Sequence, residues 1–428
     1  MRKTPVAWWS AVWERHANLL ILSSMTLVAY FAAISRLQPL LWAIAALLSA
    51  TLLTGVLLPG WLVRRLSVAR KGPSRATEGE TISFAVVVEN HGLLPRFMVE
   101  LVDRLPFLEA RPGTDKHGEK KLGLLAYVPG GSSRRFEVAL LCEQRGFYRL
   151  GPAGLASSFP LGLTEARQLR EGSEQTLTIY PDVFPIVEMP LHGSPSQIHR
   201  GNYLLPENAG SAEFSGLREY RRGDNPRHVH WPTTARLNEL MIKEFEPLAS
   251  ACLYIVLDQA ADANVGQGRQ ASFEYAVRIA ASMAKFACGN NIPTRLLGQG
   301  QTGLYQPAGT GQPHYLQLLD ELAVVAADGV TPYATLLQKI AQDCQRGETV
   351  VLFIGEPKAR LAETLKAVAL LRAGGVNVLA MVFACQSFAK PARAYDDSTT
   401  TAMASLLELG ATCLEIKSGA DLLRLFNA

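Results

Sequence analysis

The chain has 428 residues and a formal net charge of +4, which leaves room for two or three domains that each bury a core. Apolar residues make up 48% of the chain and charged residues only 19%, and the apolar excess lies near the N-terminus, which indicates membrane spans. Because the surplus of lysine and arginine flanks those apolar segments, membrane topology explains the charge and a nucleic-acid-binding protein is disfavoured.

Two long apolar segments follow a short N-terminal stretch rich in tryptophan. They run from Leu19 to Ile34 and from Leu40 to Val63. Since about 20 residues cross a bilayer, we expect two transmembrane helices joined as a hairpin. The connecting turn carries only Arg36, whereas basic residues gather at both outer ends, so both termini and all later domains are expected in the cytoplasm. Residues 1–66 are thus the predicted membrane anchor, with a cleaved signal peptide as the alternative for the first segment.

The next part of the chain changes to short β-type runs separated by glycine and proline turns. Runs at residues 81–89, 97–102, 134–141 and 176–180 are alternating or apolar. This spacing predicts a small β-sandwich over residues 67–190.

The six cysteines are scattered through the chain, without any C-x-x-C pair and mostly among apolar neighbours. We interpret them as reduced thiols of a cytosolic core, with neither a zinc site nor a disulfide framework indicated.

The segment from Gly210 to Glu246 holds balanced charges interleaved with aromatic side chains. An arginine partly removed from water needs a carboxylate to offset its desolvation, so the pattern predicts a folded, paired network. Gly223 can supply a positive-φ turn and Pro226 suits the first helical position, so a short helix is expected there, ending near Pro232.

This segment resembles the bacterial and archaeal family catalogued as domain of unknown function 58, and a looser resemblance extends over nearly the whole chain. Pro232 departs from it, because the family usually has a basic or polar residue there. We expect residues 191–249 to join the two flanking domains. The signature residues expected to act in this role are Arg218, Tyr220, Arg221, Gly223, Asp224, Arg227, Trp231, Arg236 and Glu244.

Two interpretations of this signature stay open. It can be an internal brace, in which the arginines pair with carboxylates beneath Trp231; the balanced charges favour this. Alternatively, part of it faces outward and recognises an acidic surface or a phosphate, for which the planar fork of arginine is suited. The pairs expected in the brace join Arg218, Arg221 and Arg236 to Asp224, Glu239 and Glu244.

Beyond the signature, strand and helix patterns alternate over residues 250–428. An apolar run from Cys252 to Leu257 ends at Asp258, as a buried parallel strand would. The alternation predicts a doubly wound parallel sheet with sites at the carboxyl ends of its strands. Further strands are expected at 294–297, 349–354, 376–383 and 413–416, and helices near 271–288, 313–326, 332–344, 357–372, 401–409 and 420–426.

With Asp258 after the first strand and Thr331 opening a later helix, this part resembles a von Willebrand factor A-type domain. In such domains an Asp-x-Ser-x-Ser loop, a threonine and a further aspartate bind a divalent ion. Here Ala260 and Asp262 occupy the two serine positions, and Glu356 stands where the second aspartate is expected. We therefore expect no cofactor and a degenerate site whose surface docks a protein, with Mg²⁺ held by Asp258, Asp262, Thr331 and Glu356 as the alternative.

Two further patterns receive a structural interpretation. Gly298 to Gly303 fits G-x-G-x-x-G after a strand, but the prolines and glycines that follow leave no helix to receive a pyrophosphate, so a glycine-rich hairpin loop is predicted. His228 and His230 form His-x-His, but on a short helix the two rings would diverge by roughly 200°. We expect hydrogen-bonded structural histidines rather than zinc ligands.

The family resemblance also implies partners, namely a MoxR-type AAA+ ATPase and a membrane transglutaminase-like protein. The sequence therefore leads us to expect a non-enzymatic, membrane-anchored cytoplasmic adaptor. One alternative is a metal-dependent hydrolase using carboxylates of the signature or of the A-type sheet. Another is a structural scaffold that oligomerises through the sandwich.

Overall fold

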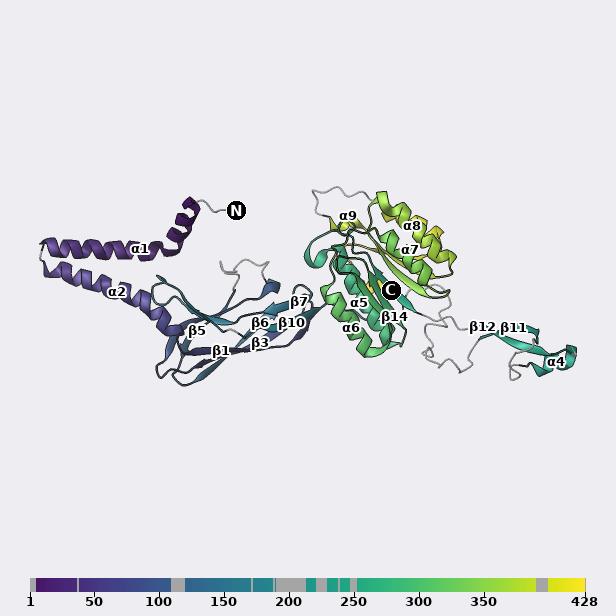
Figure 1. Cartoon of the computed structure of the whole chain (residues 1–428), viewed down its shortest axis with the longest axis horizontal. Coiled ribbons are helices and arrows are strands. Elements are labelled where there is room, and N and C mark those ends of the chain that lie inside the picture. The colour runs from purple at the N-terminus through teal and green to yellow at the C-terminus, as the bar shows by residue number, and fades with distance from the viewer. Residues whose placement is uncertain are drawn as a thin grey trace. The chain divides into compact units, whose positions relative to one another are not determined.

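The computed structural model describes residues 5–36, 38–108, 120–170, 172–187, 189, 213–220, 229–237, 239–246, 252–389 and 399–427. The chain divides into two compact units, Met1–Tyr180 and Pro181–Ala428 (Figure 1).

The first unit opens with two helices, α1 (Pro5–Arg36) and α2 (Pro39–Val63), which lie side by side as a hairpin (Figure 1). Ala17–Arg36 and Pro39–Val63 are long and apolar enough to cross a membrane, by length and composition. Close to the turn, the rings of Tyr30 and Trp42 meet edge to face with centroids 6.1 Å apart. The predicted pair of apolar helices with a tight connection is confirmed.

The rest of the first unit, here called the β region (residues 66–180), contains three sheets with strand orders β1-β3-β6, β2-β10-β7 and β5-β4-β8-β9. The four predicted runs form β3, β4, β6 and β10, whereas the other six strands were not predicted. The elements are β1 (Leu66–Lys71), β2 (Arg75–Thr77), β3 (Thr81–Asn90), β4 (Arg96–Asp103), η1 (Pro106–Leu108), β5 (Lys120–Val128), β6 (Ser133–Leu141), β7 (Gly146–Leu150), β8 (Gly154–Ser157), β9 (Ala166–Leu169) and β10 (Gln175–Tyr180).

Alternation of side chains along β3 explains how this region forms a core. Ile82, Phe84, Val86 and Val88 are buried on one face, with more exposed residues between them, as the period of two in a strand requires. Aliphatic side chains from β1, β3 and β6 share one cluster with those from β4 and β8. Two sheets thus contribute their apolar faces to a common core.

A buried ion pair joins two of these sheets. Arg70, at the end of β1, hydrogen-bonds and ion-pairs with Asp103 at the end of β4, and both side chains are almost fully buried. The same guanidinium donates to the carbonyl oxygen of Ser173 at 3.3 Å. Because each charge compensates the desolvation of the other, the pair fixes how the two strands meet.

The two compact units meet after Tyr180. The segment that follows packs on the second unit. The backbone N–H of Phe184 donates to Ser282 Oγ at 3.1 Å, and its ring lies 5.4 Å from that of Phe426. The N–H of Val187 donates to Asn427 Oδ1 at 2.8 Å.

The signature segment contains an antiparallel pair, β11 (Glu213–Glu219) with β12 (Met241–Glu246), and a short helix, α4 (Trp231–Leu237). The predicted start of a helix at Pro226 lies outside the described residues, and Pro232 does not end a helix. Pro232 lies in the first turn of α4, where its missing N–H costs nothing. His230 ends the preceding stretch and its carbonyl accepts from the N–H groups of Thr233 and Thr234.

The second unit contains a six-stranded sheet of order β15-β14-β13-β16-β17-β18, parallel except for β15. The predicted strands and helices are confirmed. Strand β15 was not predicted, because its Pro307 and Gly309 are residues typical of loops. The remaining elements are β13 (Leu253–Leu257), η3 (Gly268–Gln270), α5 (Ser272–Gly289), β14 (Thr294–Gly298), β15 (Leu304–Gly309), α6 (Gly311–Val324), α7 (Tyr333–Asp343), β16 (Thr349–Ile354), α8 (Lys358–Ala373), β17 (Asn377–Phe383), α9 (Cys385–Phe388), α10 (Thr399–Glu408), β18 (Thr412–Ile416) and α11 (Leu422–Phe426).

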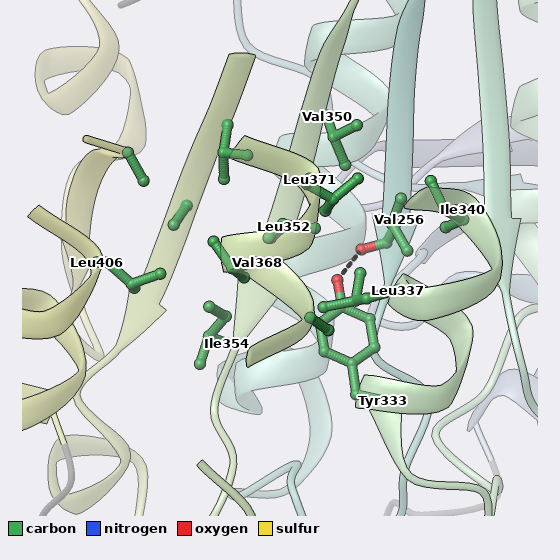
Figure 2. Packing of buried hydrophobic residues seen from close by; sticks show 14 of the residues in the cluster. Val256, Tyr333, Leu337, Ile340, Val350, Leu352, Ile354, Val368, Leu371 and Leu406 are labelled. Carbon is green, nitrogen blue, oxygen red and sulfur yellow. Dashed lines mark hydrogen bonds between the residues drawn. The ribbon is translucent and has the colours of Figure 1, made fainter. Parts of the chain in front are cut away.

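Helices α7 and α8 cover one face of this sheet (Figure 2). Leu337 and Val368 from the helices meet Val256 and Leu352 from β13 and β16 in one buried cluster. Strands buried on both faces read as continuous apolar runs, which is why this sheet was predictable from the sequence.

The cysteines that the sequence assigned to the core lie as free thiols: Cys142, Cys252, Cys288 and Cys385 are buried, and Cys344 and Cys413 are half-buried. Burial raises the pKa of the Cys142 and Cys288 thiols to about 11. Such thiols stay protonated near neutral pH, as expected of structural cysteines.

Candidate functional site

The strand order of the α/β sheet reverses beside β13. The chain passes from β13 to β14 on one side and later returns to place β16 on the other side. In open α/β sheets, ligands bind in the crevice outside the carboxyl ends of the strands at such a switch point. Asp258 directly follows β13, and Glu356 follows β16 after a single glycine. The fold therefore brings these two predicted carboxylates to the same edge of the sheet.

The loop after β13 is held by its own side chains and backbone. Oδ1 of Asp258 accepts from the N–H of Ala260 at 3.0 Å. The side-chain amide of Asn264 donates to the carbonyl oxygens of Asp258 and Ala260 at 2.9 and 2.8 Å. Ala260 also forms a parallel bridge with Gly329. These contacts hold the Asp258 carboxyl group in a fixed place beneath the loop.

The second carboxylate is positioned by helix α8. Thr364 Oγ1 donates a hydrogen bond to Glu356 Oε2, and both residues are buried. A Cβ at Gly355 would lie 2.9 Å from the carbonyl oxygen of Ala263, so the two loops approach as closely as glycine allows. Glu356 is thus locked between β16 and the first turns of α8.

Arg360 places a positive charge at this edge. Its Nη2 donates to Asp262 Oδ1 at 2.5 Å, and the Asp262 side chain is 66% exposed. Arg360 also interacts electrostatically with Glu356 and Asp258. The guanidinium of Arg360 therefore balances part of the negative charge of the carboxylates at this site.

Burial changes the acidity of both buried carboxyl groups. It raises the pKa of Asp258 to about 7, opposed by the hydrogen bond from Ala260 and increased by the nearby charge of Glu356. Burial also raises the pKa of Glu356, against the hydrogen bond from Thr364 and the charge of Arg360. Near neutral pH, Asp258 is therefore poised between its charged and neutral forms.

The hydroxyl of Tyr333 links the two strands that carry the buried carboxyl groups. Its hydroxyl donates to the carbonyl oxygen of Val256 at 2.7 Å (Figure 2) and accepts from the N–H of Phe353 at 3.4 Å. The phenol therefore joins β13 to β16, and the charges of Asp258 and Glu356 both act on it. Burial raises its pKa well above the usual value, so the hydroxyl keeps its proton.

The four predicted metal candidates do not form a cation site of the expected kind. Asp258 and Glu356 lie buried at the edge, Asp262 is paired with Arg360, and Thr331 is half-buried in the loop before α7. Within the part of the chain that the structure describes, no group of three or more His, Cys, Asp or Glu side chains could hold a metal ion. The exposed carboxylate of Asp262 already has a cationic partner in Arg360, and binding of Mg²⁺ by these residues stays a prediction.

The signature residues lie only partly in the described part of the chain. Trp231 is 67% exposed, and Tyr220 and Arg236 are also exposed. Arg218 and Glu244 belong to β11 and β12, where they stand opposite Ile242 and Gly216. Arg221, Gly223, Asp224, Arg227 and His228 lie outside the described residues, so the brace and the outward-facing interpretation both stay predictions.

Of the histidine pair, His230 is described. Its Nδ1 lies 2.8 Å from Thr233 Oγ1, a hydrogen bond within the first turn of α4. The Gly298–Gly303 motif forms the turn between β14 and the antiparallel β15, with Gly303 at φ +59°. The predicted hairpin loop is thus confirmed.

Sequence reasoning missed Arg360, Thr364 and Tyr333. One signal was available, because Glu356, Arg360 and Thr364 follow one another at intervals of four, the spacing of side chains on one face of a helix. Tyr333 had no such signal, since its partners belong to strands far away in the sequence.

The fold and this edge define an α/β sheet protein with a candidate site at its switch point. The model of a family described as protein of unknown function DUF58 matches residues 216–383, from β11 to the end of β17, and this part of the chain is similar to that family. The uncharacterized protein YeaD of Bacillus subtilis (strain 168) is similar to it, with 28% identity over 173 residues. That match spans 40% of each chain.

Solved structures show only distant similarity. The CARDB domain of a Pyrococcus furiosus protein is 14% identical, covers 27% of this chain and 94% of its own, and has a TM-score of 0.20. Proximal thread matrix protein 1 from mussel byssus is 16% identical, covers 42% of this chain and 46% of its own, and has a TM-score of 0.31.

Proposed function

We propose that this protein is a membrane-anchored adaptor whose cytoplasmic part binds other proteins without catalysing a reaction. In this proposal α1 and α2 span the membrane, the β region is a β-sandwich, and the α/β unit is a von Willebrand factor A-like recognition domain. Basic residues at the outer ends of the hairpin support the cytoplasmic orientation.

The contact between Arg360 and Asp262 carries the proposal. In a metal-dependent A-type domain, a divalent ion would balance the charge of the carboxylates at this edge. A carboxylate of the partner protein would then fill the last position in the coordination shell of the ion. Here the 2.5 Å contact with a guanidinium supplies that positive charge permanently. An edge neutralised in this way is suited to docking a folded surface and needs no ion to do so.

An exposed aliphatic side chain lies beside this edge. Val330 is 91% exposed and follows Gly329, whose backbone bridges to Ala260 in the loop after β13. An aliphatic side chain at this edge would lose its contact with water when a partner covers it, which favours binding. We propose that this edge, with Val330, contacts the partner.

The proposed partner is a MoxR-type AAA+ ATPase, and a membrane transglutaminase-like protein is proposed for the same assembly. Both partners follow from the family resemblance. The anchor would then hold the ATPase at the membrane.

The test uses the full chain in detergent and the MoxR-type ATPase of the same organism, mixed with ATP or with ADP. We expect a complex in gel filtration, and we expect Val330→Asp to weaken it about tenfold by placing a charge in the contact. Leu407→Asp is the matched control, because Leu407 is exposed near the end of α10, which leads to the amino end of β18. Absence of a complex with either nucleotide would refute the partner, and equal loss in both variants would refute the edge.

A metal-dependent hydrolase remains the second candidate, favoured by one observation. A carboxyl group with a pKa of about 7, as at Asp258, could transfer a proton at neutral pH. Elemental analysis of the purified chain, together with Asp258→Ala, separates the candidates. A stoichiometric ion lost with an activity in that variant would favour the hydrolase.

A further inference from the structure

A proline inside α2 creates a special position in the candidate membrane span. Pro59 has no N–H, so the carbonyl oxygen of Gly55, four residues earlier, lacks its helical donor. The hydroxyl of Thr164 donates to that oxygen at 3.0 Å. A residue of the β region, 109 positions further along the chain, therefore satisfies a carbonyl group of the apolar helix.

The loop that carries Thr164 packs closely on the helix at the same point. A Cβ at Gly55 would lie 2.5 Å from Leu163 Cδ1 and 3.3 Å from Leu161 Cδ1. Gly55, Pro59, Leu62 and Val63 are the buried residues along this end of α2. The loop between β8 and β9, residues 158–165, thus seats in a notch that the missing side chain of Gly55 opens.

The depth of this notch follows from helix geometry. At 1.5 Å per residue, about 24 Å of helix separate Pro39 from Gly55. The hydrocarbon core of a bilayer is about 30 Å thick, so a helix that enters at Pro39 leaves it only about 6 Å beyond Gly55. The loop contact therefore lies within the apolar layer and not beyond it.

The tip of the loop exposes apolar side chains, whereas Glu165 at its end is exposed and pairs with Arg167. Phe159 is 37% exposed and Leu161 is 46% exposed. Exposure of these apolar side chains to water is unfavourable, whereas contact with lipid acyl chains is favourable. The exposed tip of the loop therefore adds apolar side chains beside the apolar helix that it packs on.

Interfacial side chains follow at the expected level beyond the notch. Trp61 stands six positions, about 9 Å, after Gly55, and the guanidinium of Arg96 stacks on its ring at 3.7 Å. Nη2 of Arg96 also donates to the carbonyl oxygen of Arg64 at 3.3 Å, and Arg64 and Arg65 are exposed. Tryptophan with arginine is typical of the headgroup layer.

We infer that the loop of residues 158–164 is a second membrane-contact element, which enters the bilayer beside α2 and places Phe159 and Leu161 against lipid acyl chains. This inference rests on the proposed anchor function of α1 and α2. It assigns to the β region a fixed height at the membrane, with the exposed Arg64 and Arg65 at the level of the lipid phosphates.

The test places the photo-crosslinking residue p-benzoylphenylalanine at Phe159, or at Leu161, in the full chain. The chain is reconstituted in vesicles of phosphatidylethanolamine and phosphatidylglycerol whose acyl chains carry an alkyne tag. Leu47, exposed in the middle of α2, is the positive control. Phe147, exposed on β7 at the end of the β region away from α2 (Figure 1), is the negative control.

We expect positions 159 and 161 to form several-fold more lipid adduct than position 147. Adduct at 159 and 161 no greater than at 147, with strong adduct at 47, would overturn the inference and leave the anchor intact. Without adduct at 47, the anchor itself fails and the inference fails with it.

Discussion

Each unit of this protein buries an aspartate, but only one of the two carboxyl groups is paired with a buried cation. In the β region, Asp103 is buried against Arg70, and the two charges neutralise each other between sheets. In the α/β unit, Asp258 is equally buried, but its carboxyl group receives a backbone hydrogen bond at Oδ1, while Oδ2 has no partner among the described residues.

The difference separates a structural charge from a candidate functional one. A buried carboxylate with a matched cation stabilises the arrangement of its surroundings once both are in place. A buried carboxyl group with a raised pKa destabilises the fold when it ionises, and such groups gather at functional sites. The comparison therefore predicts opposite changes in stability when the cation beside Asp103 is removed and when the charge of Asp258 is removed.

Removal of the cation in the β region should have the largest effect. Arg70→Met leaves Asp103 buried without its cation, and we expect the free energy of unfolding to fall by about 3–5 kcal/mol. Denaturant titration of the full chain in detergent measures it. Arg149→Met is the matched control, because its ion pair with Glu174 is solvent-exposed and should contribute less than about 1 kcal/mol. Similar losses in both variants would mean that burial of the pair does not matter.

Removal of the Asp258 charge should stabilise the protein. Its folded-state pKa of about 7 lies above the unfolded value of 3.8, so the folded state binds the proton more tightly. The contribution of protonated Asp258 to stability is thus fully present below the unfolded pKa of 3.8. It is lost as the pH rises from there through the folded pKa of about 7. Between pH 4 and pH 6 the loss is about 2 kcal/mol.

Asp258→Asn should remove that part of the pH dependence, so that the variant is more stable than the native chain at pH 7 and similar at pH 4. Thermal unfolding across pH 4 to 8 measures this. Glu408→Gln, at an exposed position of α10, serves as the control. A native pH profile in Asp258→Asn would show that Asp258 does not titrate in this range.

The two regions also differ in how much the sequence could predict. The parallel strands of the α/β unit are continuous apolar runs, and each predicted run became a strand. In the β region, β8 has four residues without alternation and β5 mixes exposed and half-buried positions, so neither gave a strand pattern. Pro232 was misplaced because proline suits the first turn of a helix as well as its end.

The candidate site was predictable at its strands and not at its helices. Asp258 and Glu356 follow apolar runs, and parallel strands bring their carboxyl ends together. Arg360 depends on the orientation of the first turn of α8, which the spacing of four only suggests. The contact between Thr164 and Gly55 joins residues more than a hundred positions apart, and only the packed fold reveals it.

A third prediction concerns that contact. Thr164→Val removes the donor to the Gly55 carbonyl, which Pro59 has already deprived of its helical partner, so we expect a loss of about 1–2 kcal/mol. Thr164→Ser keeps the hydroxyl and is the matched control. Thermal unfolding in detergent compares them. Equal stability of the valine and serine variants would show that the carbonyl needs no donor from the loop.

The smallest effect is expected at Tyr333, which supports the candidate site without forming it. Tyr333→Phe removes the hydroxyl between β13 and β16 and leaves the Val256 carbonyl without that donor. Because the ring still fills its place in the core, we expect a loss of about 1 kcal/mol. The same change should leave partner binding intact, because the hydroxyl is buried beneath the edge. Weakened binding at unchanged stability would instead show that the junction of β13 and β16 takes part in recognition. Tyr333 would then be a functional residue and not only a structural one.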